Sequence, residues 1–371
     1  MSDKGSRAEF TVPGGLGIAS FDPGRRLRPL VRSKIKGKEG PGLMPAFGYS
    51  KKIIGPLKAI DFIGRRTRQA LALLALFLLA ANFYPASAPA QSLEPRAYSN
   101  LPIGMNFLIA GYAYQQGEVL LDPSLPLKDV NMQIHSAVLA YARSLNLFGQ
   151  SGKIDLILPY AWLSGTGKLL EEERSREVSG LADPMLRFSL NLYGAPALSF
   201  EDFKKYRQET IIGVSLSLSA PLGQYDSGRL VNIGTNRWAF KPEVGLSRAL
   251  GRWTLEGTAG VIFYTSNENF MGGKTRSQDP IYSFQGHLIY NFPSGIWAAL
   301  NATYYTGGRT SVDGEEGDDL QRNWRLGTTL TFPVDRHHSV KLYASTGVQT
   351  RTGGNFDLLG IAWQYRWGAG L

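Results

Sequence analysis

The stretch WTLEGTAGVIF, from Trp253 to Phe263, decides the fold. Its odd positions carry bulky or small apolar residues: Trp253, Leu255, Gly257, Ala259, Val261 and Phe263. Its even positions include Thr254, Glu256 and Thr258, which are polar. Successive side chains of a strand point to opposite faces, so a period of two predicts a strand with one apolar and one polar face.

The same alternation recurs along most of the chain after residue 100. Segments of this kind are typically about the 9–11 residues that a tilted strand needs to cross a bilayer. The pattern predicts twelve strands, two of which (106–115 and 131–143) alternate less cleanly. They span residues 106–115, 131–143, 153–162, 186–192, 212–220, 238–246, 253–263, 281–292, 296–305, 324–332, 340–348 and 357–367.

The connections between these strands differ in length on the two sides of the expected sheet. One set is long and polar: residues 117–130, 164–180, 221–235, 266–279 and 307–319. The alternate set is mostly short: residues 146–151, the region around Gly251, 293–295 and 334–338. Residues 194–207 and the link near Gly353 depart from this rule, and residues 200–206 favour one turn of helix. Short turns on one side and long loops on the other are typical of outer-membrane barrels.

Aromatic residues mark the strand ends, among them Tyr160, Trp238, Tyr290, Trp324 and Trp367. Tyrosine and tryptophan belong at the two membrane interfaces of a transmembrane barrel. The alternative is a soluble β protein that buries them in its core. The even strand count and the loop asymmetry favour the antiparallel transmembrane β-barrel, with both chain ends on the periplasmic side.

An export signal precedes the strands, in RRTRQALALLALFLLAANFYPASAPAQ from Arg65 to Gln91. It has a basic flank, an apolar run of about a dozen residues and a small-residue ending, in the order of a signal peptide. We expect cleavage after Ala90, which gives a signal peptide at residues 65–90 and a barrel at 91–371. A membrane anchor is the alternative, although a spanning helix needs about 20 apolar residues.

The charge of the chain is concentrated in its first part. Of 40 Lys and Arg and 30 Asp and Glu, residues 1–68 hold 15 and 5, which leaves 25 and 25 for the rest. Residues 1–64 therefore read as an unstructured basic leader. A later translation start, at Met44, or a cytoplasmic tail would each explain it. The neutral remainder argues against a nucleic-acid partner. The chain has no cysteine, which excludes disulfides and thiolate metal sites.

Two segments resemble a known family. They are GLADPMLRFSLNLYGAPAL (180–198) and the block from Ser219 to Phe270 that begins SAPLGQYDSGRL. Both are similar to the putative phenol meta-pathway (phenol degradation) outer-membrane proteins, and the resemblance covers most of residues 100–367. It implies an outer-membrane barrel distantly similar to fatty-acid and aromatic-hydrocarbon channels, which transports small hydrophobic or aromatic compounds. One departure is that Trp367 is followed by Gly-Ala-Gly-Leu, whereas many barrels end in an aromatic residue.

Charged residues on the polar faces are expected inside the barrel, because each would cost about 2–4 kcal/mol at the lipid midplane. They form either a salt-bridged interior or a polar conduit that sets selectivity. A second candidate site is the loop that holds Asp226, Asn232, Asn236 and Arg237, which is either a plain exposed loop or a gate that touches substrate. The expected lumen residues are Lys153, Asp155, Arg187, Lys241, Glu243, Glu256, His287, Arg325, Lys341 and Arg366.

No pattern predicts a catalytic, metal or cofactor site. The acidic run DGEEGDD (313–319) and the charged stretch EEERSRE (171–177) read as solvated outer loops, and the first does not match a calcium-loop pattern. A lipid hydrolase needs a serine beside a histidine, and no G-x-S-x-G motif accompanies His135, His287, His337 or His338.

We therefore expect an outer-membrane channel for passive or gated uptake of small hydrophobic or aromatic solutes. Its expected partners are outer-membrane lipid, lipopolysaccharide and the barrel-assembly machinery. The alternatives are a structural or adhesive surface barrel and, third, a lipid hydrolase.

Overall fold

The computed structural model describes residues 94–118, 127–169 and 171–371. The basic leader and the signal peptide expected at residues 1–90 lie outside this part of the chain. Within it, a single antiparallel sheet closes on itself, because β1 (Met105–Glu118) pairs with β2 (Leu127–Leu147) on one side and with β17 (Asn355–Gly368) on the other. Closure pairs the strands of the barrel wall on both sides, as a membrane requires of a β structure.

The barrel has twelve strand positions, as the alternation predicts, and one of them is shared by two strands. β3 (Gln150–Leu169) pairs with β4 (Glu172–Leu181) along one half and with β5 (Met185–Tyr193) along the other. Asp183-Pro184 lies in the break between β4 and β5, directly before β5 begins at Met185. The other strands are β6 (Thr210–Ser219), β7 (Ala239–Leu250), β8 (Trp253–Tyr264), β11 (Ile281–Asn291), β12 (Trp297–Gly307), β15 (Gln321–Pro333) and β16 (His338–Gln349).

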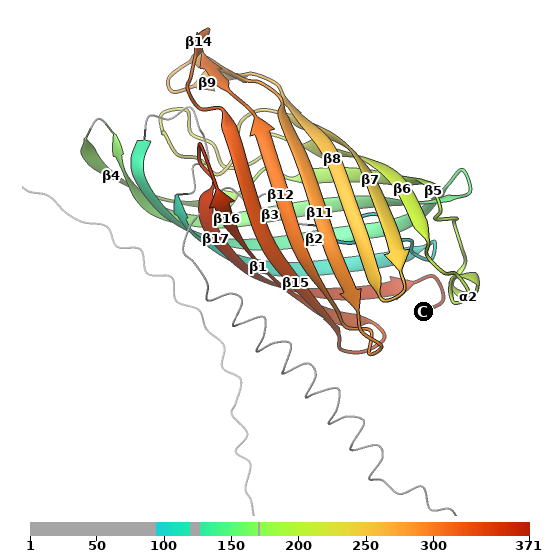
Figure 1. Ribbon diagram of the computed structural model, residues 1–371. Coiled ribbons are helices and arrows are strands. Elements are labelled where there is room, and N and C mark those ends of the chain that lie inside the picture. The colour runs from blue at the N-terminus through green and yellow to red at the C-terminus, as the bar shows by residue number, and fades with distance from the viewer. Residues whose placement is uncertain (1–93, 119–126, 170) are drawn as a thin grey trace, which may run out of the picture. The chain divides into compact units, whose positions relative to one another are not determined.

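The two ends of the barrel differ, as Figure 1 shows. We call the end with the tight turns, α2 (Phe200–Phe203) and the carboxyl terminus the turn end, and the opposite end the loop end. The helical turn expected at 200–206 is present as α2, and Ser199 is its N-cap. No helix among the described residues is long and apolar enough to cross a membrane.

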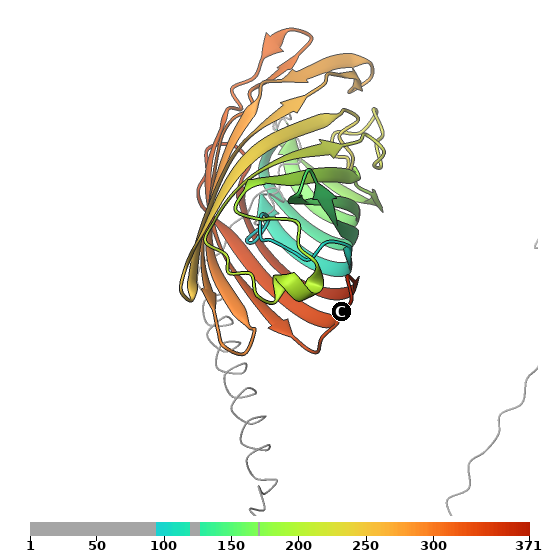
Figure 2. The ribbon, with the colours of Figure 1, turned by 90° about the vertical axis from the view of Figure 1, so that its right-hand side faces the viewer.

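Three of the connections expected as loops contain strands, which corrects the sequence interpretation. Residues 164–180 form most of the β3–β4 hairpin, so EEERSRE lies largely in β4 rather than in a loop. Residues 266–279 contain β9 (Asn267–Phe270) and β10 (Lys274–Gln278). Residues 307–319 contain β13 (Thr310–Val312) and β14 (Glu315–Glu316), which join β9 and β10 in a four-stranded sheet. Figure 2 shows how the hairpins extend the barrel wall at the loop end.

Exposure alternates along the strands in the predicted sense. In β8, the side chain of Leu255 is 46% exposed on the outer face, whereas that of Glu256 is 9% exposed on the inner face. Aromatic pairs lie on the outer surface towards both ends: the rings of Trp253 and Tyr290 are 4.7 Å apart at the turn end, and those of Tyr304 and Trp324 are 4.8 Å apart towards the loop end. The outer surface is therefore an apolar band between aromatic girdles, which fits a bilayer.

Candidate functional site in the barrel lumen

The ten charged or imidazole side chains expected in the lumen occupy inner-face positions of their strands, but they do not form one cluster. Asp155 lies opposite Arg187 across the β3–β5 pair, and Glu256 lies opposite His287 across the β8–β11 pair. Arg325 is 1% exposed. Arg366 stays at the turn end, where its Nε donates to the Arg336 carbonyl at 2.8 Å. The role of these residues in transport remains a prediction.

Lys153, Asp155 and Arg187 form an ion-pair chain on the lumen wall. Arg187 Nε donates to Asp155 Oδ2 at 2.8 Å, and Lys153 Nζ lies 3.4 Å from Asp155 Oδ1. Arg187 also pairs through Nη1 with Glu94, which precedes the first strand. On the neighbouring wall Lys241 Nζ lies 2.6 Å from Glu243 Oε2. Buried charges that are paired in this way are held in place rather than left free to attract a solute.

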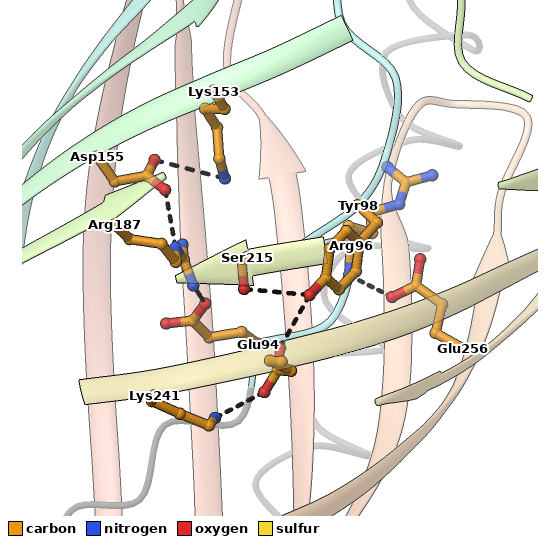
Figure 3. A network of polar contacts seen from close by, with 10 residues as sticks. Glu94, Arg96, Tyr98, Lys153, Asp155, Arg187, Ser215, Lys241 and Glu256 are labelled. Carbon is orange, nitrogen blue, oxygen red and sulfur yellow. Dashed lines mark hydrogen bonds and ion pairs between the residues drawn. The ribbon is translucent and has the colours of Figure 1, made fainter. Parts of the chain in front are cut away.

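Glu94 belongs to a segment that the sequence analysis did not place in the lumen. The segment 94–100 lies inside the barrel and crosses from β5 towards β8 (Figure 3). The backbone N–H of Arg96 donates to Glu256 Oε2 at 2.6 Å, and Arg96 Nη2 donates to Asn291 Oδ1 at 2.5 Å. The segment thus binds to the wall through its own alternating charged and polar residues.

Tyr98 anchors this segment in a notch of the wall. Its hydroxyl donates to Glu243 Oε1 at 3.2 Å and lies 3.1 Å from Ser215 Oγ. Its ring covers Gly213 and Gly245, where an added Cβ would lie 2.3 Å and 2.1 Å from ring carbons. Only glycine at both positions leaves room for the ring. Two inward glycines on adjacent strands, paired in register, were the signal in the sequence that could have revealed the notch.

A cavity of about 110 Å³ remains beside the segment. Its wall includes Arg187, Ser215, Lys241 and Glu243, and Glu94 closes one side. Lys341 projects from β16 with Lys153 and Arg187 as its charged neighbours, both of them cationic, and its Nζ lies 5.7 Å from the Tyr343 ring centre. No ion pair of Lys341 occurs within the described residues. The middle of the lumen is therefore narrow and slightly cationic.

A polar ladder crosses three strands of the opposite wall. His287 Nδ1 lies 2.8 Å from Asn301 Oδ1, and Asn301 Nδ2 donates to Thr329 Oγ1 at 3.0 Å. Nearer the loop end, Arg325 Nη2 donates to Ser345 Oγ at 2.6 Å, and its guanidinium lies 4.4 Å from the Phe356 ring centre. These contacts satisfy buried polar groups and stiffen the wall.

The loop between β6 and β7, expected as a plain loop or a gate, folds over the loop end and is tightly hydrogen-bonded. Asn232 Oδ1 accepts from the Asp226 N–H at 2.9 Å, so this pair shapes the loop itself. Asn236 Nδ2 donates to Asn267 Oδ1 at 2.8 Å, and Arg237 Nη2 donates to Gln278 Oε1 at 2.5 Å. The four candidate residues therefore hold the loop in place.

Two further residues fix this loop, and the sequence analysis did not single them out for this role. Asp183, in the break between β4 and β5, accepts hydrogen bonds from the Gly223 and Thr235 backbone N–H groups, each at 2.9 Å. Val231 is buried against the wall with Phe270 and Phe356. One carboxylate and one apolar contact thus attach the loop to the barrel.

The histidines show no catalytic arrangement within the described residues. His287 contacts Asn301, whereas His135 faces outward and contacts the Tyr112 hydroxyl. His337 meets the Arg366 carbonyl, and His338 accepts from the Trp363 indole N–H. No serine hydroxyl hydrogen-bonds to any of the four in this part of the chain, and no group of three or more His, Asp or Glu side chains there is placed to hold a metal ion.

The sequence matches the family described as "Putative MetA-pathway of phenol degradation" over residues 114–365. The chain belongs to this family. Its barrel resembles the crystal structure of an outer membrane channel from Pseudomonas putida F1, with a TM-score of 0.64 and 19% identity over 74% of this chain and 100% of that one. At this identity the likeness establishes the fold.

Other solved barrels are more distant. The CymD monoaromatic hydrocarbon channel has a TM-score of 0.38 and 6% identity over 72% of this chain and 89% of that one. The β domain of the Bordetella autotransporter BrkA has a TM-score of 0.41 and 12% identity over 71% and 100%. A search of the curated proteins gave no match.

Proposed function

We propose that this protein is an outer-membrane channel through which small hydrophobic or aromatic compounds diffuse into the cell. The observation that carries the proposal is the polar-lined cavity of about 110 Å³ that persists in the lumen beside the 94–100 segment. A barrel that served only as a scaffold or an adhesin would gain stability by packing this space with side chains. Membership of a family associated with phenol degradation supports aromatic compounds as the substrate class.

The location follows from the same proposal. A closed barrel with an apolar outer band suits the bacterial outer membrane, and its loop end would face the cell exterior. Export would use the signal peptide at residues 65–90 with cleavage after Ala90. Lipopolysaccharide would surround the loop end, and the barrel-assembly machinery would insert the protein. The lack of a Ser–His contact within the described residues supports a channel rather than a lipid hydrolase.

A solute would enter at the loop end, pass the cavity and leave at the turn end. The ion-paired wall makes the middle of the lumen narrow, so a solute must displace water and pass Arg187 and Lys241. Transport would be passive, with the solute diffusing along its concentration gradient. Movement of the 94–100 segment would widen the passage and provide the gating.

Uptake into liposomes tests the proposal. Protein purified from outer membranes is reconstituted, and uptake of ionised 4-methylbenzoate, which crosses lipid slowly, is compared with swelling in a small sugar. We expect faster uptake of the aromatic than in empty liposomes and little swelling. Swelling in the sugar would instead indicate a wide aqueous pore. If neither solute moved, the transport proposal would be wrong, and a surface barrel would be the better explanation.

A further inference from the structure

A second and larger cavity, of about 290 Å³, lies at the loop end. One side is the inner face of β2, β3 and β4 where these strands extend beyond the rest of the wall, and the other side is the segment 228–231 of the β6–β7 loop. This cavity is separate from the one beside the N-terminal segment, since the two share no lining residue. The sequence analysis placed most of this region in loops.

Two glycines line this cavity opposite its arginines. Gly165 lies directly opposite Arg176 in the β3–β4 pair, and Gly167 lies directly opposite Arg174. A Cβ at Gly165 would lie 2.8 Å from Met132 Cγ, so this glycine lets the Met132 side chain pack closely against β3. A Cβ at Gly167 would meet its nearest neighbour, Val130, at 3.4 Å, so the space in front of it is limited by an apolar wall.

The floor of this loop-end cavity is apolar. Val130, Met132 and Val231 line it and are each less than a tenth exposed. Leu169 and Leu230 complete the apolar part. An apolar surface of this kind favours the body of a hydrophobic ligand over water.

The rim is formed by three arginines, and two of them pair with carboxylates that lie outside the lining of the cavity. Arg174, Arg176 and Arg229 line the cavity, and none of its described lining residues is acidic. Arg176 Nε donates to the Val231 carbonyl at 3.2 Å, and no ion pair of Arg176 with a carboxylate occurs in the part of the chain that the structure describes. Arg229 lies 3.8 Å from Asp226, and Arg174 pairs with Glu172, in both cases at exposed positions. Exposed pairs of this kind are weak and give way to a better partner.

We propose that the loop-end cavity binds a small hydrophobic carboxylate, such as an aromatic acid. The carboxylate would lie against Arg176 and its neighbouring arginines, because a guanidinium matches a carboxylate with two parallel hydrogen bonds. The apolar body would rest on Val130, Met132 and Val231. This inference deepens the proposed function, since it names the class of solute that the channel collects before the solute enters the lumen.

Equilibrium binding to the full-length protein in lipid nanodiscs tests the inference without any transport. The probes are 4-methylbenzoate, its neutral analogue 4-methylbenzyl alcohol, and acetate and inorganic phosphate as anions without an apolar body. We expect 4-methylbenzoate to bind at least about tenfold more tightly than each of the others, which corresponds to the loss of either the charge or the apolar contact. Equal binding of the alcohol, of acetate or of phosphate would overturn the assignment.

Four variants locate the site. Arg176→Gln removes the charge but keeps a donor for the Val231 carbonyl, and Gly167→Leu fills the cavity while keeping every arginine. Both should weaken 4-methylbenzoate binding by about tenfold or more. The matched controls are Arg336→Gln, in a turn at the opposite end, and Gly286→Leu, on the outer face where a Cβ meets nothing within 4 Å. They should change the affinity by less than about twofold.

A second arginine variant covers the case in which Arg176→Gln does not fold. Arg174→Gln does not touch the loop carbonyl, so it tests the rim if Arg176→Gln fails to fold. Unchanged affinity in Gly167→Leu and in either arginine variant would overturn the inference. Wild-type uptake of 4-methylbenzoate without binding at this site would defeat the inference alone, whereas binding without uptake would defeat the proposed function alone.

Discussion

Two pairs of inward-facing glycines in this barrel have opposite outcomes. Gly213 and Gly245 form a notch that the chain fills with its own Tyr98, and the nearby charges are paired. Gly165 and Gly167 face Met132 and Val130 of β2 at the loop end, and an open cavity with an arginine rim borders them. Glycine therefore admits a side chain that closes the lumen at one level and borders an open cavity at another, and the difference depends on which segment lies opposite.

The largest expected effect comes from filling the Tyr98 notch. Gly245→Leu places a side chain where the Tyr98 ring now lies, since even a Cβ would come within 2.1 Å of it. We expect a loss of about 3 kcal/mol of stability, release of residues 94–100 and a rise in single-channel conductance. Denaturant unfolding, trypsin cleavage at Arg96 and planar-bilayer recordings measure these changes.

Gly286→Leu serves as the control for this substitution. Its glycine lies on the outer face of β11 with open space around it, so leucine there should leave Arg96 protected. If Gly245→Leu also left Arg96 protected from trypsin, the close contact of Tyr98 with the glycine pair would be wrong.

The second largest effect is expected from breaking the ion pairs around the Tyr98 notch. Arg187→Met leaves Asp155 with only the more distant Lys153 and removes the partner of Glu94. We expect a loss of about 2–3 kcal/mol, since the lumen is partly solvated and a dry pair would cost more. Denaturant titration in micelles gives the value. A double variant with Asp155→Leu should be more stable than Arg187→Met alone, and no recovery would show that the two side chains are not coupled.

The loop that walls the open cavity depends on Asp183. Asp183→Asn weakens the two hydrogen bonds from Gly223 and Thr235, because a neutral amide oxygen is a poorer acceptor than a carboxylate. We expect a loss of about 1–2 kcal/mol, faster proteolysis of residues 221–235 and weaker binding at the loop-end cavity. The contact of Tyr98 should not change. An equal increase in cleavage at Arg96 would mean that the two regions are not independent.

The smallest effect is expected from replacing Asp335, a carboxylate that contacts neither glycine pair. The backbone N–H groups of His338 and His337 donate to Asp335 and hold the pKa of this carboxyl below its usual value. Its contribution to stability is therefore present above the usual aspartate pKa and is lost as pH falls through the lowered value. Asp335→Asn should shift the thermal midpoint at pH 7 by less than about 1 °C. A larger shift of the thermal midpoint would show that the stability of the barrel depends on this turn.

The alternating positions predicted the barrel well for a physical reason. A strand with lipid on one side and a polar lumen on the other must alternate, so Trp253–Phe263 and its counterparts are visible in the sequence. The β3–β4 extension was not visible because the inner face of this hairpin carries glycines and arginines, such as Gly165 opposite Arg176, so apolar and polar residues do not alternate along it. The loop candidates were found from their polar residues, but not their anchor on Asp183.

The sequence by itself determined the closed β architecture, the apolar outer face and the charged inner positions, since these follow from the period of side chains along single strands. Only the tertiary structure decided what those positions face. The segment 94–100 enters the lumen because Glu94, Arg96 and Tyr98 find partners on strands more than 90 residues away. The loop-end cavity has its lining because strand register sets Arg174 and Arg176 opposite Gly167 and Gly165, and because residues 228–231 of a distant loop lie across from them. Register and long-range pairing are properties of neighbours in space, and a one-dimensional pattern does not contain them.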